Sequence, residues 1–428
     1  MKISEIQSGK YTGKEVEVRG WIYRTRSSGK IVFVILRDSS GIIQIPVGKN
    51  DVGEPQFKGA KKALVESSVI ARGVVREDSR APGGFEITAN YFEVVHFAEK
   101  FPITKDQSDE FLLDNRHLWL RSRELNSTFK IRSTVFKGFH DFFSERGFYE
   151  IQSPSFVTGA CEGGSTLFEV KYTDEKTVYL TQSWQLYAEA MMFSLEKIYT
   201  IAPSFRAEKS RTRRHVTEFW HAEVEAAWFH NEDMMKLVEE LIVYLCELIL
   251  EKHLPELEVL NRDPEKLKVV TTPFERVKYR KVLDILRDKG IELEWGDDFG
   301  YVEEKALTLE RDQPFFITHF PLSKGFYHRP DPEEPDSLLC HDLLAPEGYG
   351  EIVGGGERIW EPEVLMKRFE EENLDAENYS WYLDLRKYGS VPHSGFGLGL
   401  ERALSWFIGS DHIKNVIPFP RTMRRTSP

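Results

Sequence analysis

The chain has 428 residues, of which 29% are charged and 41% hydrophobic, so it is long enough for two or three domains, each with its own core. It contains no apolar run of about eighteen residues and its polar N-terminus lacks a signal-peptide core, which predicts a soluble, cytosolic protein without a membrane partner. The cysteines, Cys161, Cys246 and Cys340, are widely spaced and form no CxxC pair. This pattern predicts neither a disulfide framework nor a cysteine zinc site.

The net charge of −12 argues against a nucleic-acid partner only as an average over the whole chain. Residues 1–100 carry 16 basic and 12 acidic side chains, whereas the remainder carries 41 basic and 57 acidic ones. Polyanion binding depends on charge that is localised at a surface. The first hundred residues therefore remain a candidate nucleic-acid-binding region.

These first hundred residues show short alternating strands separated by tight turns. The expected strands are 16–23, 31–37, 42–47, 67–75 and 85–95, with a helix over 56–64. Five strands with a helix before the fourth is the order of an OB-fold barrel, whose face and loops bind oligonucleotides. We predict an OB-fold in residues 1–100; a small barrel used for protein contacts is the alternative.

The rest of the chain is predicted to be a linker followed by one large α+β domain. Residues 101–116 are polar and aperiodic, as a linker is, and the domain is expected over 117–428. Within it the periodicity predicts helices over 117–146, over 231–253 with Asn231 as the cap, over 279–289 and over 400–408. Residues 254–300 are charged and interrupted by Pro and Gly, which favours a peripheral insertion.

A short turn crowded with positive charge lies between a strand-like entry at 199–202 and an alternating exit at 219–224. Its cations are Arg206, Lys209, Arg211, Arg213 and Arg214. So much positive charge repels itself unless a polyanion lies across it. Glu208, Glu223 and Glu225 add acceptors on the same hairpin. The mixture favours a ligand with both a phosphate and an amine over a plain solvated loop.

Two further segments accompany this hairpin in a fixed order. Before it, the long helix runs into Gly-Phe-Tyr-Glu-Ile-Gln-Ser-Pro, ending at Pro154. After it comes Gly-Phe-Gly-Leu-Gly-Leu-Glu-Arg at 395–402. A dinucleotide-binding loop is excluded for the last segment, because no buried strand precedes the glycines and Glu401 and Arg402 enter a helix at once.

Together the three segments resemble the signature motifs of class II aminoacyl-tRNA synthetases. The barrel ahead of them is similar to the anticodon domain of the aspartyl, asparaginyl and lysyl group. The resemblance implies an antiparallel six-stranded sheet flanked by helices, and ATP-dependent activation of an amino acid followed by its transfer to tRNA. It also implies a homodimer, with Pro154 at the subunit interface.

The resemblance further implies an ATP site in which Arg206 and Arg402 are catalytic. Arg206 would bridge the α-phosphate and the substrate carboxylate, Phe219 would stack on the adenine, and Arg402 would cover its opposite face. The full set is Arg206, Ala207, Glu208, Arg214, His215, Val216, Phe219, Glu351, Gly399, Leu400, Glu401 and Arg402. Core packing for Phe219 and a surface salt bridge for Arg402 are the alternatives.

Asp342 and Glu351 match family positions that bind ATP-linked Mg²⁺, which prefers hard carboxylate oxygens. Solvated loop acids are the alternative. The related aspartyl pattern often has a hydroxyl residue where Gly354 stands, so no contact is carried over at that position.

The resemblance also bears on the amino acid, through Glu162, Ser183, Gln185, Ala188, Glu223 and Arg358. Aspartyl enzymes place a lysine at the position of Ala188, and an alanine cannot neutralise a buried substrate carboxylate. Arg358 would donate to a side-chain carbonyl, Glu223 would accept from an amide, and Glu162, Ser183 and Gln185 would hold the α-ammonium. We therefore expect asparagine and tRNA(Asn) as substrates.

Three alternatives stay open at this point. They are an aspartyl enzyme of relaxed tRNA choice, a paralogue that makes asparagine, and a tRNA-binding protein without activity.

On the barrel, Phe33 and Gln44 match positions that stack on and read the central anticodon base, with Arg26 on the same face. Barrel core for Phe33 and a solvated strand residue for Gln44 are the alternatives.

Overall fold

The computed structural model describes residues 1–161, 166–173, 176–208 and 213–428. The chain divides into two compact units, Met1–Leu118 and Trp119–Pro428. We call them the barrel unit and the catalytic unit and describe each by itself.

The barrel unit is a closed five-stranded barrel with the strand order β1-β2-β3-β5-β4. The strands are β1 (Glu15–Ser28), β2 (Ile31–Arg37), β3 (Ile42–Gly48), β4 (Ser68–Glu77) and β5 (Phe85–His96). All neighbours are antiparallel except β3 and β5. In β2 the buried residues Val32, Val34 and Leu36 alternate with half-exposed ones, as a strand with one face in a core requires. The predicted OB-fold is confirmed.

Short helices complete the barrel unit. Helices α2 (Lys49–Val52) and α3 (Glu54–Lys62) lie between β3 and β4, where the sequence predicts a helix. Helix α1 (Ile3–Gln7), which the sequence did not predict, buries Ile3 and Ile6 in the barrel core. Its five residues are too few to show a helical period. Helices α4 (Asp109–Asp114) and α5 (Arg116–Trp119) follow within and just after the expected linker.

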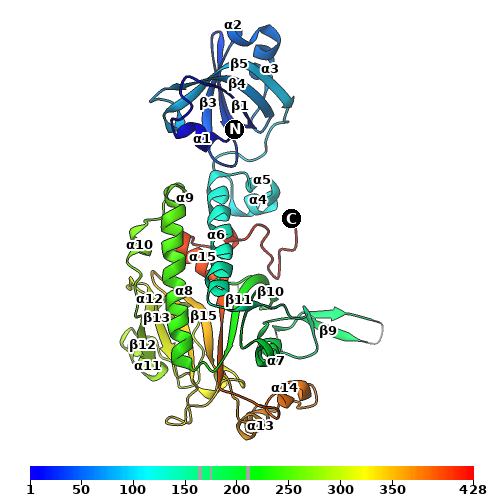
Figure 1. The fold of residues 1–428 in the computed structure, drawn as a ribbon, viewed down its shortest axis with the longest axis vertical. Coiled ribbons are helices and arrows are strands. Elements are labelled where there is room, and N and C mark those ends of the chain that lie inside the picture. Colours follow the sequence, from blue (N-terminus) through cyan, green and yellow to red (C-terminus); the bar gives the residue numbers. More distant parts are fainter. Residues whose placement is uncertain (162–165, 174–175, 209–212) are drawn as a thin grey trace. The chain divides into compact units, whose positions relative to one another are not determined.

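The catalytic unit is built around an eight-stranded sheet, which is drawn in the lower part of Figure 1. The strands in order are β12 (Glu275–Lys278), β13 (Phe315–Thr318), β14 (Cys340–Ala345), β15 (Gly350–Glu357), β16 (His393–Gly399), β11 (Glu218–Ala227), β10 (Lys197–Phe205) and β6 (Tyr149–Glu150). The six strands from β13 to β10 are mutually antiparallel, as predicted. One parallel strand is added at each edge.

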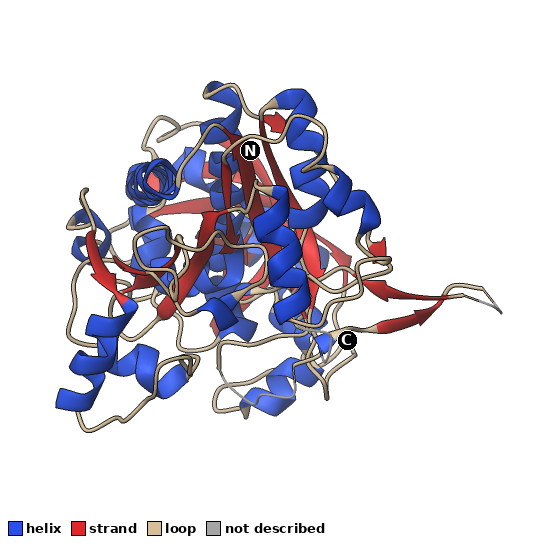
Figure 2. Ribbon diagram, turned by 90° about the horizontal axis from the view of Figure 1, so that it is seen from below, coloured by secondary structure: helices blue, strands red, loops and turns tan. Residues whose placement is uncertain are grey.

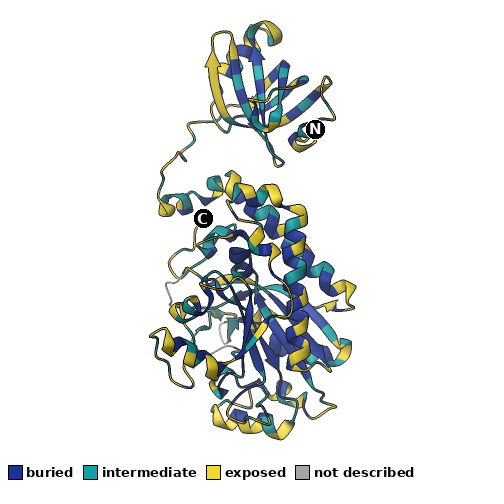
Figure 3. Ribbon diagram, turned by 90° about the vertical axis from the view of Figure 1, so that its left-hand side faces the viewer, coloured by how far each residue is buried: buried dark blue, intermediate teal, exposed yellow. Residues whose placement is uncertain are grey.

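Helices cover one face of this sheet. Helices α6 (Arg123–Glu145) and α8 (Asn231–Lys252) lie side by side, and α15 (Leu400–Ile408) packs into the same apolar core (Figure 1). In β11 the residues Ala222, Val224 and Ala226 enter that core. Because successive side chains of a strand point to opposite faces, the polar residues between them lie on the other face. The strands are the most deeply buried part of the unit (Figure 3).

Two details differ from the sequence-based predictions. The helix expected over 117–146 is interrupted, because α6 starts only at Arg123, where Ser122 accepts from the Leu125 N–H at 3.2 Å. The cap of α8 is His230 rather than Asn231, and the Asp233 carboxylate accepts from the His230 N–H at 3.1 Å. The Asn231 amide oxygen is instead 2.7 Å from His341 Nδ1.

The remaining elements surround the sheet. Strands β7 (Phe156–Val157), β8 (Glu169–Lys171) and β9 (Thr177–Leu180) form a small sheet, part of which projects as a ribbon in Figure 2. Residues 254–300 contain α9 (Leu254–Val259), α10 (Glu265–Lys268), strand β12 and α11 (Tyr279–Asp288). The other helices are α7 (Gln185–Leu195), α12 (Tyr301–Thr308), α13 (Pro362–Glu371) and α14 (Ser380–Asp384). None of the described helices has the length and apolar character needed to cross a membrane.

Candidate active site

A cavity of about 570 Å³ opens on the face of the sheet opposite α6 and α8. The β10–β11 hairpin, strands β14 to β16 and the start of α7 supply most of its walls. Residues 296–301 close one side. The cavity is far richer in charged side chains than the core behind the sheet, which indicates a charged ligand.

One half of the cavity concentrates guanidinium groups. Arg402 donates from Nη1 to Glu351 Oε2 at 2.9 Å, and its Nη2 lies 3.1 Å from His215 Nε2. Arg214 donates to the Glu351 backbone carbonyl at 2.9 Å. The Arg206 guanidinium lies 5.5 Å from the centre of the Phe219 ring. Guanidinium groups held by neighbours in this way are preorganised to receive phosphate oxygens.

His215 is neutral in this setting. Burial, together with Arg402 and Arg214, lowers the pKa of His215 to about 4. A neutral imidazole can accept a hydrogen bond, so its Nε2 serves as the acceptor for Arg402. The histidine thereby orients the guanidinium without adding charge.

Asp342 and Glu351 converge from neighbouring strands onto one point above Gly354. A Cβ built on Gly354 would lie 3.3 Å from Asp342 Oδ1 and 3.5 Å from Glu351 Oε1. Burial opposes ionisation of Glu351, but Arg402, Lys324 and Arg214 lower its pKa to about 2. Lys324 donates from Nζ to Asp342 Oδ2 at 2.6 Å. The described residues contain no group of three metal-ligating side chains, so a metal here would need ligands from a substrate.

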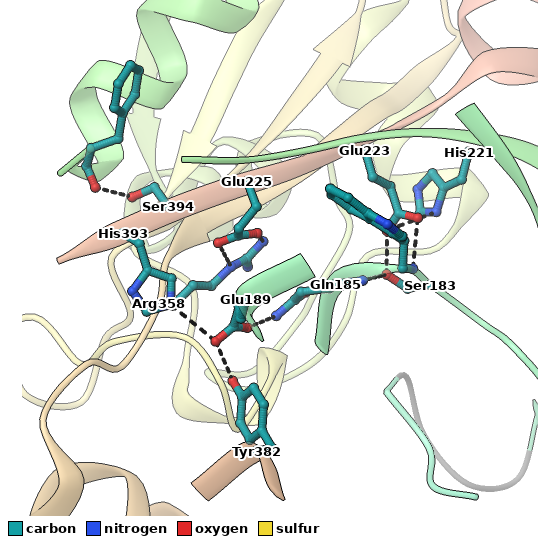
Figure 4. Close-up of polar contacts among 12 residues, drawn as sticks. Ser183, Gln185, Glu189, His221, Glu223, Glu225, Arg358, Tyr382, His393 and Ser394 are labelled. Carbon is teal, nitrogen blue, oxygen red and sulfur yellow. Dashed lines mark hydrogen bonds and ion pairs between the residues drawn. The ribbon is translucent and has the colours of Figure 1, made fainter. Parts of the chain in front are cut away.

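Another part of the cavity, which we call the pocket, is lined by Ser183, Trp184, Gln185 and Glu223. Figure 4 shows the hydrogen bonds among these residues. The Ser183 hydroxyl donates to Glu223 Oε1, and the Trp184 N–H donates to Glu223 Oε2 at 2.9 Å. The Gln185 N–H donates to Ser183 Oγ at 3.2 Å. Glu223 is 4% exposed, and a buried carboxylate held in this way fits an ammonium or amide donor.

Arg358 lies beside this pocket in a bidentate ion pair. Its Nε and Nη2 donate to Glu225 Oε1 and Oε2, both at 3.1 Å, and both side chains are nearly fully buried (Figure 4). His328 lines the cavity as well, and burial together with Arg358 and Lys324 lowers its pKa well below the ordinary value. The positive charge of Arg358 is therefore already balanced by Glu225, and the His328 imidazole is neutral.

Beneath the pocket, a buried network centres on Glu189. Its Oε1 accepts from Gln185 Nε2 at 3.1 Å, and its Oε2 accepts from the Tyr382 hydroxyl at 2.8 Å (Figure 4). Arg386 donates to the same Oε2, and His393 Nε2 lies 3.2 Å away. Glu189 is fully buried. The network fixes the start of α7, where Gln185 enters the pocket directly after Ser183 and Trp184.

On the barrel unit, the predicted base-reading residues lie on the outer surface. Phe33 is half-exposed, which excludes the barrel-core interpretation, and the Arg26 guanidinium lies 5.2 Å from its ring centre. Gln44 is also half-exposed, and its amide donates to Glu86 Oε2 at 2.9 Å. An aromatic ring, a guanidinium and an amide on the three adjacent strands β1, β2 and β3 form a surface on which a base can stack.

Comparison with known protein families identifies both units. Residues 108–423 match the family of class II tRNA synthetases (D, K and N), and residues 16–95 match the OB-fold nucleic-acid-binding domain. The chain is a class II tRNA synthetase. The family indicated by the three sequence motifs is therefore confirmed.

Individual relatives resemble the synthetase over its whole length. An asparagine–tRNA ligase of Thermoplasma acidophilum is 53% identical over 429 residues, with both chains fully covered. The crystal structure of the Pyrococcus horikoshii asparaginyl-tRNA synthetase complexed with asparaginyl-adenylate has a TM-score of 0.97 at 47% identity, covering 100% of this chain and 99% of that one. An aspartyl-tRNA synthetase of Entamoeba histolytica has a TM-score of 0.86 at 27% identity, covering 100% and 92%.

Most of the predicted site residues of the synthetase come together at the cavity. Those lining it are Ser183, Gln185, Arg206, Glu208, Arg214, His215, Val216, Phe219, Glu223, Asp342, Glu351, Arg358, Gly399, Glu401 and Arg402. Ala207 and Leu400 are not among the lining residues. Ala188 is fully buried in a separate apolar cluster with Trp184 and Met192. Glu162 lies outside the described residues, as do Lys209 and Arg211 of the basic turn.

Glu401 contacts the cavity, yet its carboxylate is engaged elsewhere. It forms an ion pair with Arg132 at 2.7 Å and accepts from the Trp220 N–H at 2.9 Å. These contacts tie α15 to α6 and β11.

Sequence reasoning missed several residues of the site, chiefly Glu189, Lys324, His328 and the stretch 296–301. Glu189 stands four residues after Gln185 on a helix, a spacing that places both on one face and offered a signal. Lys324 is 18 residues from Asp342 in a segment without periodicity, and no sequence pattern marks their contact.

Proposed function

We propose that this synthetase joins asparagine to ATP as asparaginyl-adenylate, releases pyrophosphate, and transfers the asparaginyl group to the terminal ribose of tRNA(Asn). The observation that carries the choice of asparagine is the ion pair of Arg358 with Glu225, next to Glu223. Glu225 already pairs with the Arg358 guanidinium, and Glu223 is a second buried carboxylate that lines the same cavity.

A substrate with a carboxylate side chain would add a third negative charge to that pocket, and burying an unpaired charge costs several kcal/mol. A carboxamide adds none. Its carbonyl oxygen can accept from Arg358, and its NH₂ can donate to Glu223. A site that hydrogen-bonds an NH₂ group rejects analogues that lack it. The neutral His328 supports the same choice, because it offers no cation to a substrate carboxylate.

The activation step joins two anions. A carboxylate oxygen of asparagine attacks the α-phosphorus of ATP, the bond to the bridging oxygen breaks, and pyrophosphate leaves with that oxygen. Arg206 stabilises the charge on the α-phosphoryl oxygens, and Arg402, oriented by Glu351 and His215, binds the nucleotide. Phe219, with Arg206 over its face, provides an apolar surface for the adenine.

Asp342 and Glu351 are proposed to hold ATP-linked Mg²⁺. Their converging oxygens above Gly354 fit an ion that uses one or two protein carboxylates and takes its other ligands from phosphates and water. The ion supplies charge neutralisation at the phosphates.

The barrel unit is proposed to read the anticodon through Arg26, Phe33 and Gln44, with residues 101–116 as the linker and 117–428 as the catalytic domain. We also propose a homodimer with Pro154 at its interface. Pro154 is exposed, and so are its large neighbours Tyr149 and Phe156, at 58% and 48%. Exposed apolar side chains near one another favour an interface. The cytoplasm is the proposed location.

ATP–pyrophosphate exchange tests the proposal, with asparagine and aspartate compared on the full-length enzyme. We expect exchange with asparagine and at least about 100-fold less with aspartate. Exchange that is faster with aspartate would overturn the substrate assignment. The matched variant Arg358→Lys keeps the charge but loses the bidentate pair, and we expect it to weaken asparagine use without creating aspartate use.

A further inference from the structure

The carboxylate pair Asp342 and Glu351 is divided into inner and outer oxygens. The inner oxygens, Asp342 Oδ1 and Glu351 Oε1, converge above Gly354. Each outer oxygen contacts a cation of the protein itself. Lys324 Nζ lies 2.6 Å from Asp342 Oδ2, and Arg402 Nη1 lies 2.9 Å from Glu351 Oε2.

Arg402 belongs to the motifs that define the site, whereas Lys324 has no assigned role. Lys324 comes from the short 3₁₀ turn η3 (Leu322–Lys324), and its side chain is 27% exposed against 7% for Asp342. The ammonium also lies 4.4 Å from the centre of the Phe320 ring. Both contacts hold it at the cavity wall rather than in solvent.

The Lys324 ammonium contacts the outer oxygen of Asp342 directly. The ammonium takes one lone pair of Asp342 Oδ2. Its positive charge, held this close, repels a second divalent ion from the same oxygen.

Gly354 adds an independent observation. With no side chain, it contributes no side-chain oxygen to the point where the inner oxygens meet, so among the described residues two carboxylates are offered to that point. A protein site with two oxygens, completed by phosphates and water, suits a single Mg²⁺.

We propose that Lys324 is a positioning residue that replaces a divalent cation at Asp342, so that the Asp342–Glu351 pair binds one Mg²⁺ between its inner oxygens and no second ion. This inference rests on the proposed function only in assuming that the pair binds a nucleotide-linked metal. The Lys324 ammonium offsets the negative charge at Asp342 Oδ2 whether or not Mg²⁺ is bound. It also fixes the carboxylate so that Oδ1 points to the shared metal position.

The test counts Mn²⁺ ions bound to the full-length protein saturated with α,β-methylene-ATP, by electron paramagnetic resonance of the free ion. Lys324→Met removes the charge with little change in volume. We expect it to bind about one Mn²⁺ more per protomer than the unaltered protein, because the outer oxygen of Asp342 becomes available. Lys324→Arg keeps a cation there and is expected to leave the count unchanged.

The matched control is Lys266→Met, which removes a lysine that forms an ion pair with Asp312 at 2.9 Å and does not line the cavity. It should leave the count unchanged. Equal counts for the unaltered protein and Lys324→Met would overturn the inference, as would an equal gain in Lys266→Met.

Thermal unfolding gives a second readout. Added Mn²⁺ should raise the melting temperature of Lys324→Met more than that of the unaltered protein, because an additional site binds the folded state. Lys324→Gln serves if the methionine variant does not fold.

No amino acid is present in these measurements. A failure of asparagine-dependent exchange would therefore overturn the proposed function alone, and an unchanged Mn²⁺ count would overturn this inference alone.

Discussion

The most buried ion pairs of the catalytic unit lie deeper than those of the barrel unit. On the barrel, ion pairs such as Arg19–Glu17 lie at the surface, with side chains 74% and 29% exposed. In the catalytic unit, Arg386–Glu189 and Arg358–Glu225 are at most 4% exposed. Exposed pairs contribute little, whereas a buried pair is costly to break because one charge is left without a partner.

The contrast follows from what each unit is proposed to bind. A base that stacks on Phe33 arrives from a flexible nucleic-acid loop, and a half-exposed ring with adaptable neighbours suits it. A reacting carboxylate and phosphate need fixed positions within fractions of an ångström. The catalytic unit therefore surrounds its cavity with interlocked buried charges, and the four predictions below test this difference.

The largest effect is expected from Glu189→Gln. The change leaves Arg386 buried without its carboxylate, and breaking a buried pair costs about 3–5 kcal/mol. We expect the free energy of unfolding of the catalytic unit, measured from its transition in urea, to fall by this amount. The barrel variant Glu17→Gln, which breaks exposed pairs, should change it little. A small loss in Glu189→Gln would show that the network is not a structural requirement.

The next largest effect is expected from Arg206→Ala. Removing one preorganised donor to a developing charge costs roughly 100- to 1,000-fold in turnover. Pyrophosphate exchange with asparagine should fall by that factor while circular dichroism stays unchanged. Arg26→Ala on the barrel, another guanidinium over a phenylalanine ring, should leave exchange intact. Equal losses in both variants would contradict the separation of roles.

A moderate effect is expected from Phe33→Ala. Base–aromatic stacking contributes about 1–3 kcal/mol per base, so the KM for tRNA should rise correspondingly in aminoacylation. Exchange in the absence of tRNA should not change, because the ring lies on the barrel surface. Unaltered charging of tRNA would remove Phe33 from the recognition surface.

The smallest effect concerns acid stability and His215. Its pKa is about 4 in the folded state against 6.5 as the ordinary value, so the unfolded chain takes up the proton first as the pH falls. Stability contributed by the neutral imidazole is complete above pH 6.5 and is lost between pH 6.5 and about 4. His215→Gln should reduce the slope of unfolding free energy against pH in that window by up to about 1.4 kcal/mol per unit. An identical slope would mean that the pKa of the imidazole is the same in the folded and the unfolded protein.

Much of the fold was predictable from sequence because its signals are local. The alternation in β2 and the apolar period of α6 and α8 each lie within one element. The limits of α15 and the β10–β11 hairpin followed from glycines and charge at their ends. The gap before α6 was not predicted, because its cap at Ser122 lies within a stretch that is otherwise periodic.

The candidate site was predictable where a motif is contiguous, as in the turn that begins at Arg206. Contacts between distant segments were not. Lys324 meets Asp342, and Glu189 meets Arg386, only because the sheet and α14 bring them together. Residues 296–300 lie in a stretch whose composition favours a peripheral position, yet they line the cavity.

Strand β11 supplies both the apolar residues of the core and, through His221, Glu223 and Glu225, a wall of the cavity. Inserting one residue in its middle would reverse the facing of every residue on one side of the insertion, burying a carboxylate among the helices and turning an apolar residue toward the cavity. A residue added in the turn between β10 and β11 would not have this effect, whereas one added within β11 would. This wall of the cavity can therefore be altered without disturbing the core only by replacing side chains at a fixed spacing.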